Sequence, residues 1–204
     1  MRSLCDQHGA MYIADEVQTG LGRSGHMWAG ERFQVVPDIL VTGKGLSGGL
    51  YPIAATLLGE RAGEWLQSDG WGHISTFGGA ELGCVVAGEV LTMTAETLPS
   101  VPDLERAWAA GLADVQKAHP DWLVEVRQTG VIIGLRFAHE AGGMLMTRLL
   151  FDEGVWAMFA GFDRSVLQVK PGLLMDPADT AAVLAALDRA CTVAERTLHP
   201  NEAN

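Results

Sequence analysis

The sequence is poor in cysteine and in long apolar runs. Its three cysteines, Cys5, Cys84 and Cys191, are odd in number and far apart, and no C-x-x-C pair occurs. This spacing provides neither a disulfide framework nor a thiolate metal site, and it suits a reducing compartment. No apolar run reaches the ~20 residues that span a bilayer, and the first residues lack the apolar segment of a signal peptide. We therefore expect a cytoplasmic chain without a membrane partner.

Positive charge is also scarce. The chain has 14 lysine and arginine residues against 25 aspartate and glutamate residues, a formal net charge of −11. Nucleic-acid binding needs a basic surface that neutralises phosphates, so nucleic acid is not an expected partner. The histidines lack the H-E-x-x-H or paired spacing of a zinc site, so we expect no metal. Hydrophobic residues make up 48% of the 204 residues, enough to bury a sizeable core.

Short apolar runs and helical periodicities predict an α/β chain in two parts. In the first part, strands are expected over residues 11–17, 38–43 and 53–59, and a helix over 80–97. The second part begins with a helix over 104–118. Its strands are expected over 123–129, 131–137, 155–159 and 166–169, with a helix over 141–153. We therefore predict a partial large domain, 1–98, with a mixed or parallel sheet and helices, and a small α/β domain, 99–204.

A final helix is predicted from its start signals and its apolar spacing. Asp176 is a typical N-cap residue, and Pro177 suits the first helical turn. Apolar residues then recur at helical spacing from Val183 to Leu198. We expect this stripe to be buried.

One glycine motif suggests a nucleotide site. The run Gly20–Gly25, GLGRSG, matches the G-x-G-x-x-G pattern, and Asp38 follows at about the spacing of a ribose-binding acid. In dinucleotide-binding folds that acid ends the second strand, whereas Asp38 precedes the apolar run Ile39–Val41. Pro37 also leaves little room for a crossover helix. A nicotinamide-binding oxidoreductase is therefore a minor alternative.

Chemically useful side chains follow the first two predicted strands at their carboxyl ends. Two-residue alternation places Asp15 and Val17 on one face of the first strand, with Gln18 at its end. After the second strand, Lys44 stands among small residues, in GKGLSGG, which would let a flat ligand approach closely. Ligands of open α/β sheets bind outside the carboxyl ends of the strands, so these residues are candidates for a site.

The ordered motifs resemble those of the class III (ω-amino acid) aminotransferases of pyridoxal-phosphate (PLP) fold type I. They are Asp-x-Val-Gln from Asp15, GLGRSG from Gly20, Pro37-Asp38, Lys44 and the run STFGG over 75–79. The resemblance implies that Lys44 holds PLP as a Schiff base and acts as an acid/base while an amino group moves from an amino donor to an oxo acid.

The resemblance also implies roles for the other residues. Asp15 would pair with the pyridine nitrogen, Val17 would pack on the ring, and Gln18 would reach the ring hydroxyl. Thr76 would contact the cofactor phosphate of a partner subunit, which implies a homodimer. Each residue alone also fits a plain structural role: strand-end cap (Asp15), core residue (Val17), loop amide (Gln18), helix N-cap (Thr76) or solvated charge (Lys44). Their order along the chain favours the PLP site.

Two departures from the family pattern leave alternatives open. Family members are considerably longer, and their N-terminal portion holds the cofactor phosphate, so we expect the C-terminal portion of an aminotransferase, present as a fragment. Many members carry Arg-x-x-Pro-Pro-Leu, whose arginine forks onto a substrate carboxylate. Here the run is QVKPGL, with Gln168 in place of that arginine, and Lys170 or another residue would have to substitute. A catalytically silent truncated module and a PLP-dependent lyase, aminomutase or racemase are the alternatives.

Overall fold

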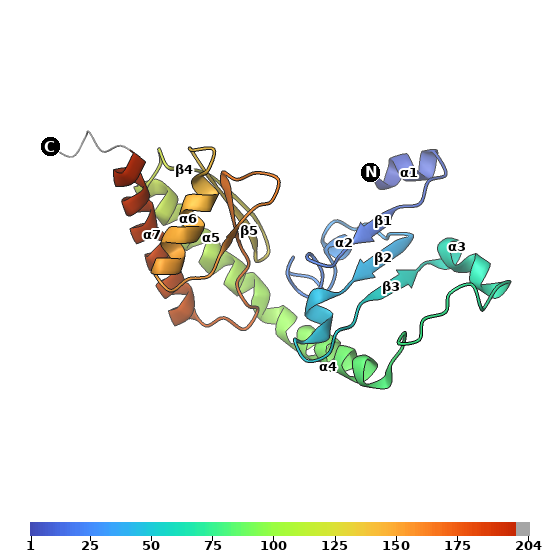
Figure 1. The fold of residues 1–204 in the computed structure, drawn as a ribbon. Helices are drawn as coiled ribbons and strands as arrows, with labels where there is room; N and C mark the ends of the chain where they lie inside the picture. The colour runs from blue at the N-terminus through green and yellow to red at the C-terminus, as the bar shows by residue number, and fades with distance from the viewer. Residues whose placement is uncertain (199–204) are drawn as a thin grey trace. The chain divides into compact units, whose positions relative to one another are not determined.

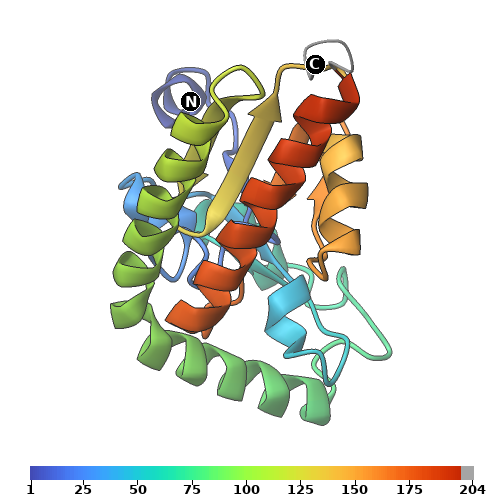
Figure 2. The same cartoon turned by 90° about the vertical axis from the view of Figure 1, so that its left-hand side faces the viewer.

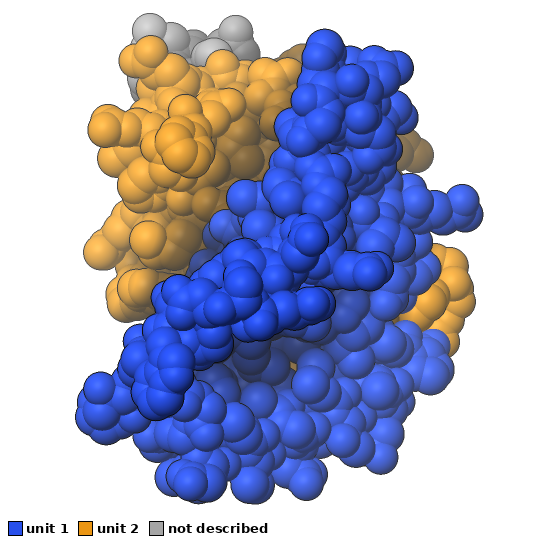
Figure 3. Space-filling view, turned by 90° about the vertical axis from the view of Figure 1, so that its right-hand side faces the viewer, with its two compact units in different colours: residues 1–99 blue, residues 100–204 orange. Residues whose placement is uncertain are grey.

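A computed structural model of the chain describes residues 1–198. The contacts between residues divide the chain into two units, Met1–Pro99 and Ser100–Asn204, which have different colours in Figure 3. Each unit contains one sheet and its own helices (Figure 1). Within residues 1–198, no helix has both the length and the apolar character needed to cross a membrane.

The sheet of the first unit has three strands in the order β1–β2–β3. β1 (Ile13–Asp15) and β2 (Ile39–Thr42) are parallel, and β3 (Ala55–Leu58) is antiparallel to β2 (Figure 1). Each strand lies within its predicted run but is shorter. β1 ends at Asp15 because the chain turns there, and the N–H of Val17 donates to the Asp15 carboxylate at 3.0 Å. The expected mixed sheet is therefore present.

The helices of the first unit include one long helix that the sequence predicts. This helix, α4 (Glu81–Thr97), agrees with the expected range 80–97. The other helical segments have four to six residues, too few for a helical period to show in the sequence: α1 (Arg2–Gln7), α2 (Ala29–Arg32), η1 (Lys44–Ser47), α3 (Glu60–Gly63) and η2 (Glu64–Gln67). α4 packs on η1, where a Cβ added at Gly48 would lie 3.0 Å from Val90 Cγ2. α4 therefore supports the turn that begins with Lys44.

The second unit contains a four-stranded antiparallel sheet in the order β4–β5–β7–β6. Its strands are β4 (Leu123–Thr129), β5 (Ile132–Phe137), β6 (Met158–Phe159) and β7 (Val166–Val169). Its helices, α5 (Val101–Ala118), α6 (Gly142–Asp152) and α7 (Pro177–Leu198), lie on one face of the sheet with α7 in the middle (Figure 2). The segment η3 (Leu98–Ser100) precedes α5. α5 starts earlier than predicted because Pro102 is tolerated in a first helical turn.

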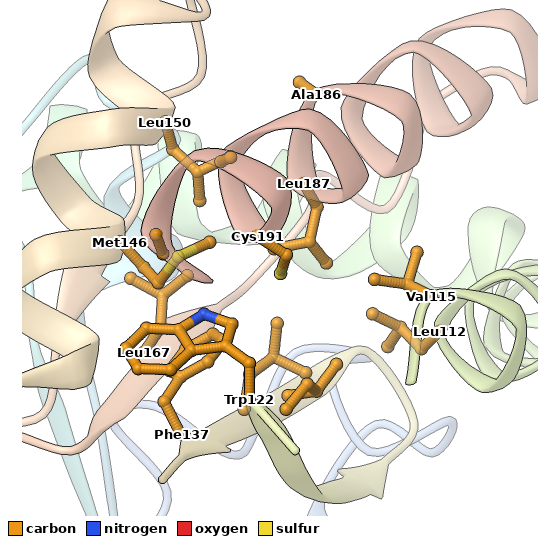
Figure 4. Packing of buried hydrophobic residues seen from close by; sticks show 14 of the residues in the cluster. Leu112, Val115, Trp122, Phe137, Met146, Leu150, Leu167, Ala186, Leu187 and Cys191 are labelled. Carbon is orange, nitrogen blue, oxygen red and sulfur yellow. The ribbon is translucent and has the colours of Figure 1, made fainter. Parts of the chain in front are cut away.

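The helices and the sheet of the second unit enclose an apolar core. The rings of Trp122 and Phe137 have centroids 5.2 Å apart, and Leu167 of β7 joins the same cluster (Figure 4). The predicted stripe of α7 is buried here at Leu187, whereas the side chain of Leu198 lies outside the described residues. Burial of such side chains contributes about 1.5–3 kcal/mol each, so this unit has a core of its own.

α7 is also held by polar contacts at its start and along its C-terminal half. At its start, the N–H of Asp179 donates to the Asp176 carboxylate at 2.7 Å, so the predicted N-cap is confirmed. Farther along, the ring nitrogens of His119 lie 3.0 Å from Asp188 Oδ1 and 2.9 Å from Glu195 Oε2. These contacts join the C-terminal end of α5 to α7.

The first unit leaves large apolar side chains exposed. Ile13 of β1 is 57% exposed and Leu57 of β3 is 49% exposed, while Val85 of α4 is 64% exposed. The connection from η2 to α4 adds Phe77, at 82%. Side chains of this type are usually buried. The first unit therefore offers apolar surface on which further protein could pack.

Candidate active site

The carboxyl ends of β1 and β2 bring Asp15 and Lys44 to one edge of the first sheet. Asp15 is paired with Val41 in the parallel ladder, and the N–H of Glu16 extends this ladder by donating to the Val41 carbonyl at 2.8 Å. Lys44 follows Val41 by three residues, and only Gly43 separates it from the end of β2. Because parallel strands end at the same edge, the carboxylate and the amine belong to the same region of the surface. Both side chains are exposed.

Val17 lies against the residue that precedes Lys44. A Cβ added at Gly43 would be 3.9 Å from Val17 Cγ2 and 3.4 Å from the Cβ of Ala54. Val17 is half-buried, and Gln18, which follows it, is exposed. Two neighbouring strand ends thus carry a carboxylate, an apolar side chain, an amide and an amine.

The backbone of Lys44 is unusual for a residue with a side chain. Its φ is 45°, in the left-handed region, where a non-glycine residue costs about 1–2 kcal/mol. Lys44 begins η1, and Leu46 in the same turn is 3% exposed, so a buried side chain anchors this turn. Strained residues of this kind cluster at active sites and ligand clamps. Leu21 and Gln34 also have a left-handed backbone, with φ of 55° and 53°, so the strain alone assigns no role to Lys44.

The glycine motif Gly20–Gly25 forms turns beside a buried carboxylate. That carboxylate belongs to Glu16, which accepts hydrogen bonds from the Thr19 hydroxyl and from the N–H groups of Ala29 (3.1 Å) and Gly30 (2.9 Å). The first N–H groups of α2 are therefore bonded to protein. The sequence analysis did not single out Glu16. Two-residue alternation places Glu16 on the opposite face from Asp15, and this signal could have shown that the two acids have different surroundings.

Asp38, the ribose-binding acid of the dinucleotide alternative, is engaged within the protein. It accepts the N–H of Tyr12 at 2.7 Å and a guanidinium N–H of Arg2 at 2.7 Å. These bonds, the first of them foremost, hold the pKa of the Asp38 carboxyl below its usual value. Because the glycine motif also forms turns and does not open a helix, the geometry of a dinucleotide site is not formed.

Thr76 belongs to a different segment from the residues at the strand ends. It is exposed on the connection between η2 and α4. Within residues 1–198, no hydrogen bond or ion pair joins Thr76 to Asp15 or Lys44. The alternative role of Thr76 as the N-cap of α4 is wrong, because that position is occupied by Ala80.

Gln168 stands in β7 of the second unit. Its amide nitrogen donates to the Phe159 carbonyl at 3.4 Å, and its amide oxygen accepts from the Lys170 ammonium at 2.5 Å. A lysine charge is therefore adjacent to the position where the sequence motif would have an arginine.

Comparisons with known proteins agree with this arrangement. A family model described as aminotransferase class-III matches residues 1–191. An uncharacterized aminotransferase of Archaeoglobus fulgidus is 43% identical over 177 residues, which are 86% of this chain and 42% of that protein. Succinylornithine transaminase of Yersinia enterocolitica is 35% identical over 191 residues, which are 92% of this chain and 45% of that protein.

Solved structures show the same relationship. The N-acetylornithine aminotransferase of Stenotrophomonas maltophilia matches with a TM-score of 0.82 at 29% identity, over 96% of this chain and 50% of that chain. The expected α/β fold and the resemblance to transaminases are confirmed by these matches. This chain spans about half the length of the curated relatives it matches. From its motifs, its fold and the match over residues 1–191, the chain belongs to the class-III aminotransferase family.

Proposed function

We propose that this chain carries the cofactor lysine of a PLP-dependent transaminase, which moves an amino group from an amino donor to an oxo acid. Lys44 would hold PLP as a Schiff base. The observation that carries the proposal is the parallel pairing of β1 with β2, because it sets the Asp15 carboxylate and the Lys44 amine at one sheet edge. Membership of the class-III aminotransferase family supports the same cofactor.

The residues at this edge suit PLP. An exposed primary amine can bind an aldehyde, and a carboxylate nearby can stabilise a protonated pyridine nitrogen. Gly49, in the same turn as Lys44, has open space around it, since no atom lies within 4 Å of a Cβ added there. The turn is therefore uncrowded at Gly49, whereas a Cβ added at Gly45 would lie 3.2 Å from Leu21 Cδ1.

Each side chain at the edge has a separate task in this proposal. PLP, when bound, acts as an electron sink for the carbon that loses its proton. The Asp15 carboxylate would pair with the ring nitrogen, Val17 would pack on the ring face, and the Gln18 amide would hydrogen-bond the ring hydroxyl. The Lys44 amine would hold the cofactor and, once freed by the amino donor, would be the base positioned to move the proton of the donor carbon.

The cofactor phosphate needs donors beyond these residues. Three arginines of the first unit are engaged: Arg2 with Asp6 and Asp38, Arg32 with the Ser24 carbonyl, and Arg61 with the Gly9 carbonyl. We assign one phosphate contact to the Thr76 hydroxyl of a partner subunit, so the working form would be a homodimer.

The relatives and the cysteines suggest the substrates and the compartment to examine first. Succinylornithine transaminase and acetylornithine aminotransferase are among the relatives, so acylated ornithines are the first amino donors to test. Gln168 cannot form the two charge-assisted bonds of an arginine, which argues against assuming a dicarboxylate acceptor. All three cysteines are free thiols, which supports the reducing cytoplasm as the compartment.

The half reaction tests this function. The chain is loaded with PLP and mixed with an acylated ornithine in the absence of an oxo acid. We expect conversion of the cofactor to its amine form with release of an oxo product, and no conversion by the Lys44→Ala variant. Carbon dioxide, an epimerised amine or a shifted amine among the products would point instead to a lyase, a racemase or an aminomutase of the family.

A catalytically silent interaction module is the second candidate. The exposed apolar side chains Ile13, Leu57, Phe77 and Val85 favour it, because apolar surface of this kind drives association. Light scattering and PLP titration over a range of protein concentrations separate the two candidates. Association without PLP binding would support the silent module, whereas PLP binding followed by the half reaction would exclude it.

A further inference from the structure

Three residues of the turn after β2 have a left-handed backbone. Lys44, Gly48 and Gly49 have φ values of 45°, 55° and 72°. Glycine adopts this region readily, so the conformations of Gly48 and Gly49 need no further support. Lys44 does not share this freedom. Something in the surrounding structure must hold its backbone in place.

The hydroxyl of Ser47 connects the two ends of this turn. It donates a hydrogen bond to the Lys44 carbonyl at 2.7 Å and accepts one from the N–H of Gly49 at 3.1 Å. One side chain thus ties left-handed Lys44 to left-handed Gly49. A side chain that bonds the backbone in this way stabilises a local turn against other conformations.

We propose that Ser47 is a positioning residue for Lys44. The Ser47 hydroxyl holds the backbone of Lys44 in the left-handed conformation from which the Lys44 amine reaches the PLP aldehyde. The inference rests on the proposed function of Lys44. Ser47 touches the lysine backbone through its own hydrogen bond and acts on the cofactor only through Lys44. The backbone also closes this turn, since the N–H of Leu46 donates to the Gly43 carbonyl at 3.0 Å. Without the Ser47 hydroxyl, the turn would lose two of its bonds, and Lys44 would leave its strained conformation more readily.

The sequence provides internal references for a test. Its lysines are Lys44, Lys117 and Lys170, so PLP has three side-chain amines to choose from. The test variant is Ser47→Ala, which removes both hydrogen bonds, and Ser47→Thr restores a hydroxyl. The matched control is Ser68→Ala, because the Ser68 hydroxyl also donates to the carbonyl three residues before it, that of Trp65, at 2.9 Å.

Each protein is titrated with PLP, and the visible absorbance gives the amount of Schiff base. The adducts are then reduced with borohydride, and the tag on Lys44 is divided by the tags on Lys117 and Lys170. We expect Ser47→Ala to lower this ratio about fivefold or more, as the loss of one or two hydrogen bonds implies. Ser47→Thr should recover most of the ratio, and Ser68→Ala should keep the wild-type value.

The outcomes separate the inference from the function on which it rests. A wild-type protein without a preferred tag on Lys44 overturns both the proposed function and the inference. A wild-type preference that Ser47→Ala leaves unchanged overturns only the role of Ser47. Equal loss in Ser47→Ala and Ser68→Ala, without recovery in Ser47→Thr, would mean general destabilisation and would also contradict the inference.

Discussion

Asp15 of β1 is paired with Val41 of β2 in the parallel ladder, and Lys44 follows Val41 by three residues. This pairing fixes how far the carboxylate and the amine can be separated, because both are tied to the same pair of strand ends. Asp15 also accepts the N–H of Val17 through one oxygen, at 3.0 Å. The carboxylate still has lone pairs for a ring nitrogen. The local cap and the proposed cofactor contact are therefore compatible.

Replacement of Asp15 by asparagine tests its role as the partner of the ring nitrogen. We expect Asp15→Asn to keep the Schiff base on Lys44 but to slow the half reaction by about 10²-fold or more, as for other losses of an electrostatic contact. The measurement is single-turnover absorbance with an amino donor. Asp69→Asn is the control, since Asp69 accepts the N–H of Trp71 at 3.1 Å in a turn of the same kind. Equal rates in both variants would contradict the role of Asp15.

Two glycines of the first unit should respond to alanine with opposite signs. Gly48 has a φ of 55°, and an added Cβ would lie 3.0 Å from Val90 Cγ2, so Gly48→Ala should destabilise by at least about 1 kcal/mol. Gly88 lies within α4, and no atom is within 4 Å of an added Cβ. Gly88→Ala should therefore stabilise by about 0.5–1 kcal/mol. Urea unfolding measures both changes, and a destabilising Gly88→Ala would contradict the open surroundings of Gly88.

The stability of the second unit should depend on pH through Glu125. The guanidinium groups of Arg127 and then Arg136 lower the pKa of the Glu125 carboxyl to about 2 from 4.5. A lowered folded-state pKa gives stability that is present above pH 4.5 and is lost as pH falls toward 2. The difference in urea midpoint between wild type and Glu125→Gln should shrink over this window. A difference that stays constant over this window would contradict the ion-pair network.

The thiols should differ sharply in reactivity. Cys191 is fully buried, and burial foremost, with Glu195 and Asp188 nearby, raises the pKa of its thiol to about 12. Cys84 is exposed. At pH 8, iodoacetamide should modify Cys84 in the native chain and Cys191 at least about 10³-fold more slowly, because the thiolate is the reactive form. Peptide mass spectrometry before and after denaturation measures the rates, and comparable native rates would contradict the packing of α7.

Elements with a clear period or a start signal could be predicted from the sequence. The strands and long helices came from apolar runs and spacing, and Asp176 with Pro177 marked the start of α7. The start of α5 was not predicted, because the helix was expected from residue 104, whereas Pro102 lies within its first turn. The short helices gave no signal, since four to six residues complete too few turns to show a period.

Part of the candidate site could likewise be predicted from the sequence, and part could not. Asp15 and Lys44 stood out because Asp15 lies at the end of an apolar strand, Lys44 follows another, and both occur in a motif order. Glu16 did not, since its burial depends on the distant N–H groups of Ala29 and Gly30. The left-handed backbone of Lys44 and its bond to Ser47 are likewise set by the folded turn, where sequence alone shows only a lysine and a serine among glycines.

The position of the Schiff base is the most direct test of the proposed function. The wild-type chain is incubated with PLP, reduced with borohydride and digested, and the tagged peptide is identified by mass spectrometry. The proposal predicts a tag on Lys44, with Lys117 and Lys170 modified far less. A tag absent from Lys44, or spread evenly over the three lysines, would contradict it.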